Sequence, residues 1–508
     1  MKTGLWLRFR RAAYRRDSWV AALSAFGLGA LLSFALAPLH ILLSLPFALG
    51  GIGVLALWAR SGMQAAVIGW LAGLGYFSFG LSWIVEPFQI DADRYAWMAP
   101  FALVFLAAGV ALFWGLAFGL AARWQRGGAR LVLLMALWSL AEFGRAYLLT
   151  GFPWAGFAQF WIDTPAAQLL PWIGAQGLAL LTLLVTLPLA LLRYRPLLAV
   201  LPLLLVALAG YALPPPPVPE MTDKLVRLVQ PNAPQAEKWL PERRWDFVRR
   251  AIELSETSST SDSPKPDLIV WPETSVPQLL NNADETLSAI STRIGGAPLL
   301  LGIQRREEGR YFNSAILLDA AGQVVQIYDK AHLVPFGEYV PFGDLMAQFG
   351  IHGFAAQQGA GYSAGPGAAL LDLGIGVAQP LICYEAVFAR DVNATTTRPD
   401  MLIQITNDAW FGTRSGPYQH LVQARMRAAE QGLPMLRAAN TGITAMIDPY
   451  GRMREHIVLG KSGAVDGYLP KPLEPTLFRR TGDWPVFILC IFLALGVAVF
   501  GRKSHGRS

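Results

Sequence analysis

The side chains best suited to chemistry are a cysteine, a glutamate and a lysine that lie far apart in one polar block of the chain. Cys383 ends an apolar run and is the only cysteine between about residues 224 and 480. Glu273 ends a Trp-Pro-Glu string, and Lys330 ends a Tyr-Asp-Lys string. Together they offer a nucleophile, a base and a cation, which is the set needed for covalent catalysis.

The three residue types also suggest their roles. A thiol with a pKa near 8.5 needs help to ionise, and Glu273 is the candidate base that removes its proton. Lys330 is a fixed cation suited to the oxyanion of a tetrahedral intermediate. Glu338 and Glu385 are expected to hold that ammonium in its charged form, or else to form ordinary structural ion pairs. We group Tyr384 with these supporting residues.

Several aromatic residues near these strings are candidate substrate contacts. The alternative for each of them is ordinary packing in the core. The candidates are Trp239, Phe336, Trp410 and Phe411. A mobile lid that screens a reactive intermediate from water would draw on Phe336, Tyr339, Val340, Pro341, Phe342, Trp410 and Phe411. His332 is expected to be a hydrogen-bonded scaffold residue, and Asn407 with Asp408 could simply make a turn.

The elements that must position these residues fall into two kinds. The 508 residues are 54% hydrophobic and only 15% charged, which is outside the range of an ordinary soluble protein. A bilayer core needs roughly 20 apolar residues in a helix. Eight runs reach or approach that length: Trp19 to Ala37, Ile41 to Ala59, Ala65 to Val85, Trp97 to Ala122, Leu131 to Leu149, Ala166 to Leu192, Leu197 to Leu213 and Pro485 to Phe500.

The fifth run carries two charges, Glu142 and Arg145, which lie three residues apart on one helical face. An isolated central charge costs about 2.5 to 3.5 kcal/mol on insertion scales. We therefore expect these two side chains to pair or to point into the bundle.

Lys and Arg collect in alternate loops and in both tails, which predicts the orientation. The basic positions are Lys2, Arg8, Arg10, Arg11, Arg15, Arg16, Arg60, Arg123, Arg126, Arg130, Arg193, Arg195, Arg502, Lys503 and Arg507. Eight spans place both termini in the cytoplasm and the polar block outside it. The net charge of +7 is thereby explained by topology, without a nucleic-acid partner.

The N-terminus and the two cysteines each require an interpretation. The basic tail, apolar run and Ala35-Leu36-Ala37 resemble a cleaved secretory signal, but Pro38 would follow the cut and more spans come after it. Cys383 and Cys490 are predicted to stay unbridged, because one lies outside and the other within the last span. Cys490 is expected to act as a small hydrophobe.

The polar block reads as an α/β domain. Helix-like segments, namely 239–257, 284–294, 386–393 and 419–432, separate short β-rich runs. The predicted strands are 225–230, 268–271, 299–303, 314–318, 324–328, 376–383, 401–406 and 444–447, with hairpins at Ala321-Gly322 and Pro449-Tyr450-Gly451. The expected domains are 1–217 with seven helices, 218–480 with the catalytic fold, and 481–508 with the last helix. Functional groups are expected at strand ends.

Four strings carry a family resemblance. Val270-Trp-Pro-Glu-Thr274, Tyr328 to Glu338, Leu381-Ile-Cys-Tyr-Glu385 and Thr406 to Phe411 resemble, in order, the Glu, Lys and Cys motifs of the carbon-nitrogen hydrolase (nitrilase) superfamily. The Leu-Val-Pro-Phe-Gly-Glu string, the Gly151-Phe-Pro-Trp154 loop and the seven-plus-one spans are similar to the apolipoprotein N-acyltransferases of bacterial inner membranes. The resemblance covers nearly the whole chain.

The resemblance implies a bundle of membrane helices joined to an α-β-β-α sandwich on the periplasmic side of the inner membrane. It also implies a ping-pong transfer of an acyl chain through Cys383. The donor would be a membrane phospholipid, and the acceptor would be the α-amino group of the diacylglyceryl-cysteine of an apolipoprotein. A monomer is expected, with no cofactor, and the histidines and cysteines show no metal-ligand spacing.

Two other functions compete with this one. A membrane-anchored amidase or nitrilase could hydrolyse an amide with the same triad, although a water-soluble substrate would not require seven preceding spans. A transporter with an inactive outer domain is the third reading, and it is disfavoured because the spans hold few ionisable residues beyond Glu142 and Arg145.

Overall fold

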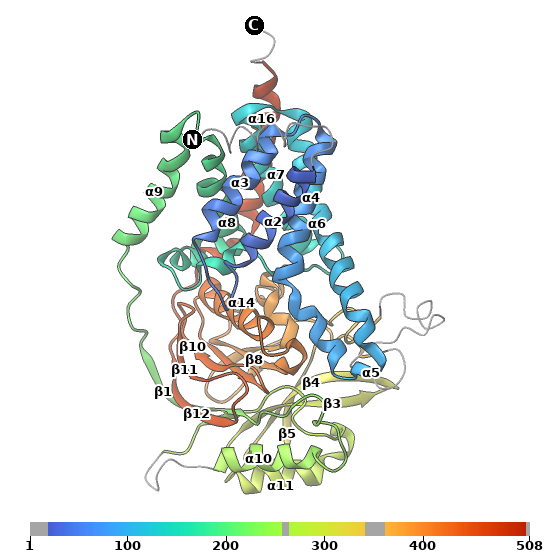
Figure 1. Cartoon of the computed structure of the whole chain (residues 1–508). Coiled ribbons are helices and arrows are strands. Elements are labelled where there is room, and N and C mark those ends of the chain that lie inside the picture. Colours follow the sequence, from blue (N-terminus) through green and yellow to red (C-terminus); the bar gives the residue numbers. More distant parts are fainter. Residues whose placement is uncertain (1–18, 257–263, 341–360, 504–508) are drawn as a thin grey trace. The chain divides into compact units, whose positions relative to one another are not determined.

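The computed structural model describes residues 19–256, 264–340 and 361–503. The chain divides into two compact units. We call them the helical unit (Met1–Phe88, Ala92–Pro215, Arg480–Ser508) and the α/β unit (Gln89–Asp91, Pro216–Arg479) (Figure 1). The predicted charges in the first sixteen residues and at Arg507, together with Pro341 and Phe342, lie outside the described residues.

Each of the eight apolar runs contains a helix, as predicted. Short segments connect or extend these helices. They include 3-10 segments of three to eight residues, among them η1 (Ser82–Gln89) and η5 (Leu187–Leu191), and the short helix α5 (Ala92–Tyr95). The eight helices are α2 (Trp19–Ser33), α3 (Ser44–Trp58), α4 (Gly62–Gly80), α6 (Ala99–Trp124), α7 (Gly127–Tyr147), α8 (Leu170–Thr186), α9 (Pro196–Ala212) and α16 (Trp484–Lys503).

Within the part of the chain that the structure describes, three helical stretches are long and apolar enough to cross a membrane, namely Ala92–Trp124, Gly127–Tyr147 and Pro165–Leu191. A fourth arises if α4 and η1, which meet at a bend of 46°, form one span. The other apolar helices are shorter; a helix of 15 residues, such as α2, rises only about 22 Å against a core of about 30 Å. The count of eight spans therefore stays a prediction.

Glu142 and Arg145 form a buried ion pair on α7, one of the arrangements predicted. The indole nitrogen of Trp114 donates to Glu142 at 2.7 Å. The Arg145 guanidinium also donates to the backbone carbonyls of Phe152 and Trp154. Burial of the two charges is tolerated because each has a partner and further hydrogen bonds. The pair fastens the loop after α7 to the helix.

The α/β unit contains two six-stranded sheets. Their orders are β12-β1-β2-β3-β4-β5 and β11-β10-β9-β8-β7-β6. The first sheet comprises β1 (Met221–Gln230), β2 (Leu268–Val270), β3 (Leu299–Glu307), β4 (Arg310–Leu318), β5 (Val324–Asp329) and β12 (Gly463–Pro470). The second comprises β6 (Leu371–Asp372), β7 (Val377–Ile382), β8 (Met401–Thr406), β9 (Met435–Ala439), β10 (Thr444–Ile447) and β11 (Met453–Ile457).

The sheets lie between two layers of helices, which makes the predicted α-β-β-α sandwich (Figure 1). Helices α10 (Arg244–Glu256) and α11 (Asp284–Arg293) bury Ala251 and Leu287 against the first sheet. Helix α14 (Gly416–Gln431) buries Leu421 and Ala428 against the second. The inner faces meet where β1 packs on β9 and β10.

The predicted strands are present, and both predicted hairpins join antiparallel neighbours, β4 with β5 and β10 with β11. One helix begins later than predicted, and four of the described strands were not predicted. The helix expected from Trp239 begins at Arg244, because Pro241 lies in the turn before it. Strands β6, β9, β11 and β12 carry weak strand signals and were not predicted.

Candidate active site

Cys383 stands directly after β7, at the start of the 3-10 turn Cys383–Val387. Its φ of +52° is in the left-handed region, which non-glycine residues seldom adopt. Its carbonyl oxygen accepts a hydrogen bond from Gln404 Nε2 at 3.0 Å. A strained backbone held by surrounding contacts is a common feature of functional sites.

The thiol of Cys383 is buried, and burial is the main reason that its pKa is raised above its ordinary value. The negative charge of Glu273 raises that pKa further, whereas Lys330 and a hydrogen bond with Thr406 lower it. The resting thiol therefore carries its proton at neutral pH, and ionisation requires a nearby base.

Glu273 follows β2 and is held by two hydrogen bonds. Asn313 Nδ2 donates to Oε1 at 2.6 Å, and the backbone nitrogen of Asn407 donates to Oε2 at 2.8 Å. Only 7% of Glu273 is exposed. Asn407 directly follows Thr406, the residue that forms a hydrogen bond with the Cys383 thiol. The carboxyl end of β8 therefore positions both the Glu273 carboxylate and the Cys383 thiol.

Lys330 follows β5 and is 1% exposed. Its Nζ lies 2.8 Å from Glu338 Oε2. Burial alone would lower the pKa of Lys330, but the negative charges of Glu338 and Glu273, and that of Cys383 when its thiol is ionised, outweigh it and raise that pKa. The side chain is therefore a permanent cation beside the thiol.

Asn313, on β4, joins the acid to the ion pair. Its Nδ2 donates to Glu338 Oε1 at 3.2 Å as well as to Glu273, and its carbonyl accepts from the backbone nitrogen of Lys330 at 2.9 Å. Val334 donates its backbone nitrogen to the second oxygen of Glu338. One asparagine thus fixes the relative positions of base and cation.

Glu385 is placed differently from the expectation that it pairs with Lys330. Its Oε1 accepts from the Tyr328 hydroxyl and from the backbone nitrogens of Ala331 and His332, and its Oε2 accepts from that of Ile382. These donors flank Lys330 and Cys383 in the sequence, so Glu385 holds the backbone next to each of these two residues in place. It acts on the ammonium only through space.

The neighbouring aromatic side chains have packing roles. His332 stacks on Phe388 with ring centroids 3.8 Å apart, and its Nδ1 lies 2.6 Å from Asp391. It is therefore a scaffold residue, as expected. Tyr384 is buried and packs edge-on against both His332 and Phe388.

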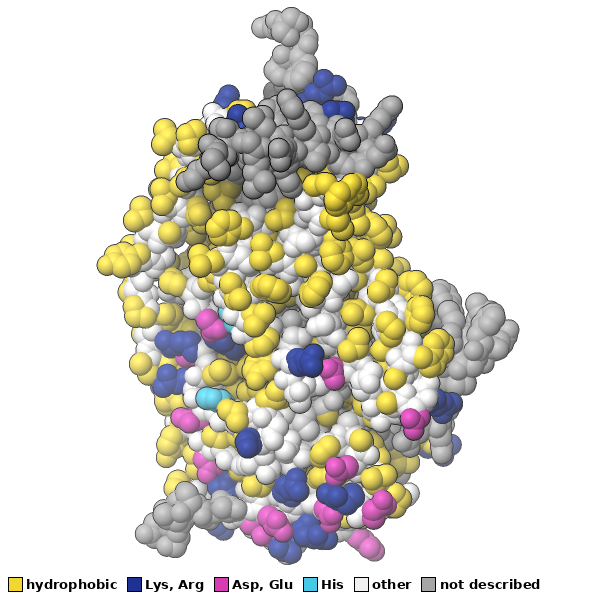
Figure 2. Space-filling model, in the orientation of Figure 1, with side chains coloured by type: hydrophobic (Ala, Val, Ile, Leu, Met, Phe, Trp, Pro, Cys, Tyr) yellow, Lys and Arg dark blue, Asp and Glu magenta, His cyan; other side chains and the backbone are white. Residues whose placement is uncertain are grey.

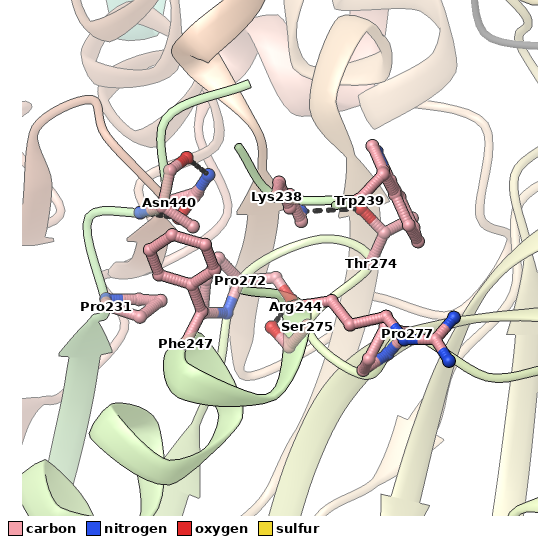
Figure 3. Close-up of a pocket in the computed structure, with 11 residues that line it drawn as sticks. Pro231, Lys238, Trp239, Arg244, Phe247, Pro272, Thr274, Ser275, Pro277 and Asn440 are labelled. Atoms are coloured by element: carbon pink, nitrogen blue, oxygen red, sulfur yellow. Dashed lines mark hydrogen bonds between the residues drawn. The ribbon is translucent and has the colours of Figure 1, made fainter. Parts of the chain in front are cut away.

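The four candidate substrate contacts are not alike. Phe411 is 8% exposed and packs against His420, so its position fits the alternative of ordinary packing in the core. Phe336 is 52% exposed and has a left-handed φ of +62°. Trp410 is half-buried. Trp239 is half-buried too and lines a pocket beside Thr274 (Figure 3).

A buried network of charged side chains below Cys383 was not predicted from the sequence. Asp408 lies 2.5 Å from Arg437 and 2.9 Å from His420. Arg437 also donates to Gln404, the residue that holds the Cys383 carbonyl. Burial would raise the pKa of Asp408, but Arg437 and His420 lower it to about 2. Asp408 is thus more than a turn residue.

Two other residues escaped sequence reasoning, Asn313 and Lys238. Asn313 sits inside an ordinary strand, so nothing nearby marks it. Lys238 precedes Trp239 and resembles a solvated lysine, yet it is buried against the Glu273 loop. Among the described ranges, no group of three or more His, Cys, Asp or Glu side chains could hold a metal ion.

Comparisons with known proteins agree with this architecture. The Carbon-nitrogen hydrolase family matches residues 225–456, and the Apolipoprotein N-acyltransferase N-terminal domain matches residues 28–187. The fold is therefore a carbon-nitrogen hydrolase domain joined to a bundle of apolar helices.

Curated relatives narrow this class. The chain is 37% identical to the apolipoprotein N-acyltransferase of Rhodopseudomonas palustris over 96% of both chains. It is 37% identical to that of Brucella suis biovar 1 over 87% of both. The chain belongs to the apolipoprotein N-acyltransferase family of the carbon-nitrogen hydrolase superfamily, and it is an acyltransferase.

The solved structures to which the chain is similar are more distant in sequence. An amidase from Nesterenkonia sp. AN1 is 18% identical with a TM-score of 0.37, and it covers 50% of this chain and 94% of its own. A carbon-nitrogen hydrolase superfamily protein from Xanthomonas campestris is 20% identical with a TM-score of 0.35, covering 53% and 97%.

Proposed function

We propose that this protein transfers a fatty acyl chain from a membrane phospholipid to the α-amino group of the diacylglyceryl-cysteine that begins an apolipoprotein. The observation that carries the proposal is one buried site that gathers Cys383, Glu273 and Lys330, with Asn313 joining Glu273 to the ion pair of Lys330 and Glu338. The names of the relatives supply the acceptor class.

The first half reaction begins when Glu273 takes the proton of the Cys383 thiol. The thiolate attacks the ester carbonyl of the phospholipid, and the negative charge that develops on the carbonyl oxygen is stabilised by Lys330. When the intermediate collapses, the ester C–O bond breaks. Glu273 returns its proton to the departing oxygen, which leaves a lysophospholipid and a thioester on Cys383.

The second half reaction uses the same groups in reverse order. The amine of the acceptor attacks the thioester carbonyl, Lys330 again faces the oxyanion, and Glu273 takes a proton from the attacking nitrogen. The C–S bond then breaks, so an amide leaves and the thiolate recovers the proton held by Glu273. Glu338, Asn313 and Glu385 keep the reacting groups in place.

We also propose that both termini are cytoplasmic and that residues 218–480 form the catalytic domain on the outer face of a bacterial inner membrane. The alternation of Lys and Arg among the loops supports this orientation. A reporter that is active only outside the cytoplasm should work when fused at Pro219 and should fail at Arg195. Activity of a fusion after Ser508 would refute the even number of spans.

The function is tested by exposing purified protein to phospholipid and measuring the mass of the peptide that contains Cys383. A long-lived increase equal to one fatty acyl chain is expected, and a diacylated lipopeptide should discharge it. Steady release of free fatty acid, with no adduct and no response to the lipopeptide, would favour a hydrolase instead.

A further inference from the structure

The loop that carries Glu273 is closely packed on one side by β3. The Gly302 nitrogen donates to the Pro272 carbonyl at 3.2 Å, and the Ser275 nitrogen donates to the Gly302 carbonyl at 2.7 Å. A Cβ at position 302 would lie only 2.6 Å from Glu273 Cα. Glycine is therefore required there, and the loop has no room to shift toward the sheet.

Lys238 holds the same loop from another direction. Its Nζ donates to the Thr274 hydroxyl at 2.8 Å and to the Glu273 carbonyl at 3.1 Å. Figure 3 shows the Lys238 side chain directed at Thr274 across the pocket. Thr274 has a φ of +48°, which is costly for a β-branched residue. The two hydrogen bonds offset that cost and hold the backbone next to the carboxylate.

The charge of Lys238 is as unusual as its position. The side chain is 6% exposed, and its hydrogen-bond acceptors are both neutral oxygens. Burial lowers its pKa to about 8, while the negative charge of Glu273 acts in the opposite direction. Arg244, at the start of α10, is the other charged residue that lines this pocket. At neutral pH, Glu273 therefore has an ammonium close behind its backbone.

We propose that Lys238 is a positioning residue for Glu273. Its two hydrogen bonds fix the loop that carries Glu273, and its positive charge lies close behind the Glu273 carboxylate. The inference rests on the proposed role of Glu273 as the base. It adds to the three catalytic side chains a fourth group that acts only through one of them.

The test measures the rate at which iodoacetamide alkylates Cys383 across a range of pH, with the modified peptide quantified by mass spectrometry. This rate depends on thiol ionisation and needs no lipid substrate. Lipopeptide acylation is followed in parallel. The variants are Lys238→Met, Lys238→Arg and Thr274→Val, and Lys461→Met serves as a control that removes an exposed lysine elsewhere in the α/β unit.

Lys238→Met should slow alkylation at pH 7 about tenfold and move the acid limb of the profile to higher pH by about one unit, because Glu273 loses a neighbouring positive charge. Lys238→Arg should restore the position of that limb. Thr274→Val should reduce the rate without moving the limb, since it removes a hydrogen bond and no charge. Lys461→Met should match wild type.

The proposal would be overturned if Lys238→Met lowered the alkylation rate equally at every pH and Lys238→Arg did not restore it. An unchanged alkylation profile in Lys238→Met would overturn it as well. The two hypotheses fail separately. If wild type never acylates a lipopeptide but its alkylation profile responds to Lys238→Met as stated, the proposed function is wrong and the positioning role stands. If acylation proceeds through Cys383 but Lys238→Met leaves the alkylation profile unchanged, the proposed function stands and the positioning role is wrong.

Discussion

The two units differ in which side chains they bury and which they expose. Helix α9 of the helical unit buries Ala199 but leaves Leu197 82% exposed and Tyr211 92% exposed. Helix α14 of the α/β unit buries nearly every residue, including the ion-paired Arg427 and Glu430. Figure 2 shows hydrophobic side chains gathered over the helical unit and charged ones over the α/β unit.

The difference follows from the solvent that each unit meets. Exposed apolar area costs roughly 25 cal/mol per Å² in water, so a helix such as α9 is suited to an apolar surrounding. In the helical unit the buried pair of Glu142 and Arg145 serves to fasten a loop. In the α/β unit, by contrast, part of the buried charge, namely Glu273, Lys330 and Glu338, gathers near Cys383. Buried charge therefore holds a loop in the helical unit, and in the α/β unit some of it is proposed to serve catalysis.

The largest expected effect separates the two cysteines, one in each unit. Cys383→Ala should abolish both adduct formation and lipopeptide acylation, because in the proposed mechanism only the thiol carries the acyl group, and Cys383→Ser should retain at most a trace. Cys490→Ala should be nearly silent, since Cys490 packs among apolar residues of the helical unit. Acylation by Cys383→Ala near the wild-type rate would refute the covalent mechanism.

The next effect concerns the buried ion pair of the helical unit. Glu142→Gln leaves the Arg145 guanidinium buried without its counter-charge, which typically costs about 3 to 5 kcal/mol. The thermal midpoint of the protein in detergent should fall markedly. Glu220→Gln is the matched control, because Glu220 pairs with Lys471 on the exposed surface, and it should leave the midpoint nearly unchanged. Equal midpoints for both variants would contradict the structural role of the buried pair.

In the α/β unit, Glu338→Gln should reduce acylation about 100-fold, or about 2.7 kcal/mol, because Lys330 loses its ion-pair partner. The sign of its pH dependence follows from the charges. Glu338 raises the pKa of Lys330, so its removal lets burial lower that pKa. The variant should therefore lose further activity as the pH becomes alkaline, over a range where wild type keeps its rate. A uniform loss would show that Glu338 does not maintain the charge.

The smallest effect is on the buried network below Cys383. The pKa of Asp408 is about 2, below its ordinary value of about 3.9, so its ionised form stabilises the fold above about pH 4. That stabilisation, about 2 kcal/mol, should disappear as the pH falls through 4 toward 2. Asp408→Asn should lose it at neutral pH and show a weaker acid dependence, as measured by unfolding at several pH values. An identical acid profile in the variant would assign the transition to other carboxylates.

Much of this architecture could be predicted from the sequence, because it depends on local pattern. The eight apolar runs became helices, and β8 and β10 match their predicted bounds, since each signal lies within the segment that forms the element. Strand β11 was missed because it is a largely exposed Met-Arg-Glu-His-Ile strand with few apolar residues. Strand β12 was missed because glycines interrupt it.

For the candidate site, the sequence by itself determined which side chains could react and that Glu273, Lys330 and Cys383 each follow a strand. Only the tertiary structure decided their partners. Asn313 reaches Glu273 across 40 residues of sequence, and Asn407 reaches it across 134. It also assigned Glu385 to backbone support and Lys238 to the Glu273 loop. The physical reason is that a local pattern specifies a strand and its end, whereas hydrogen bonds and ion pairs between strand ends depend on how the two sheets pack.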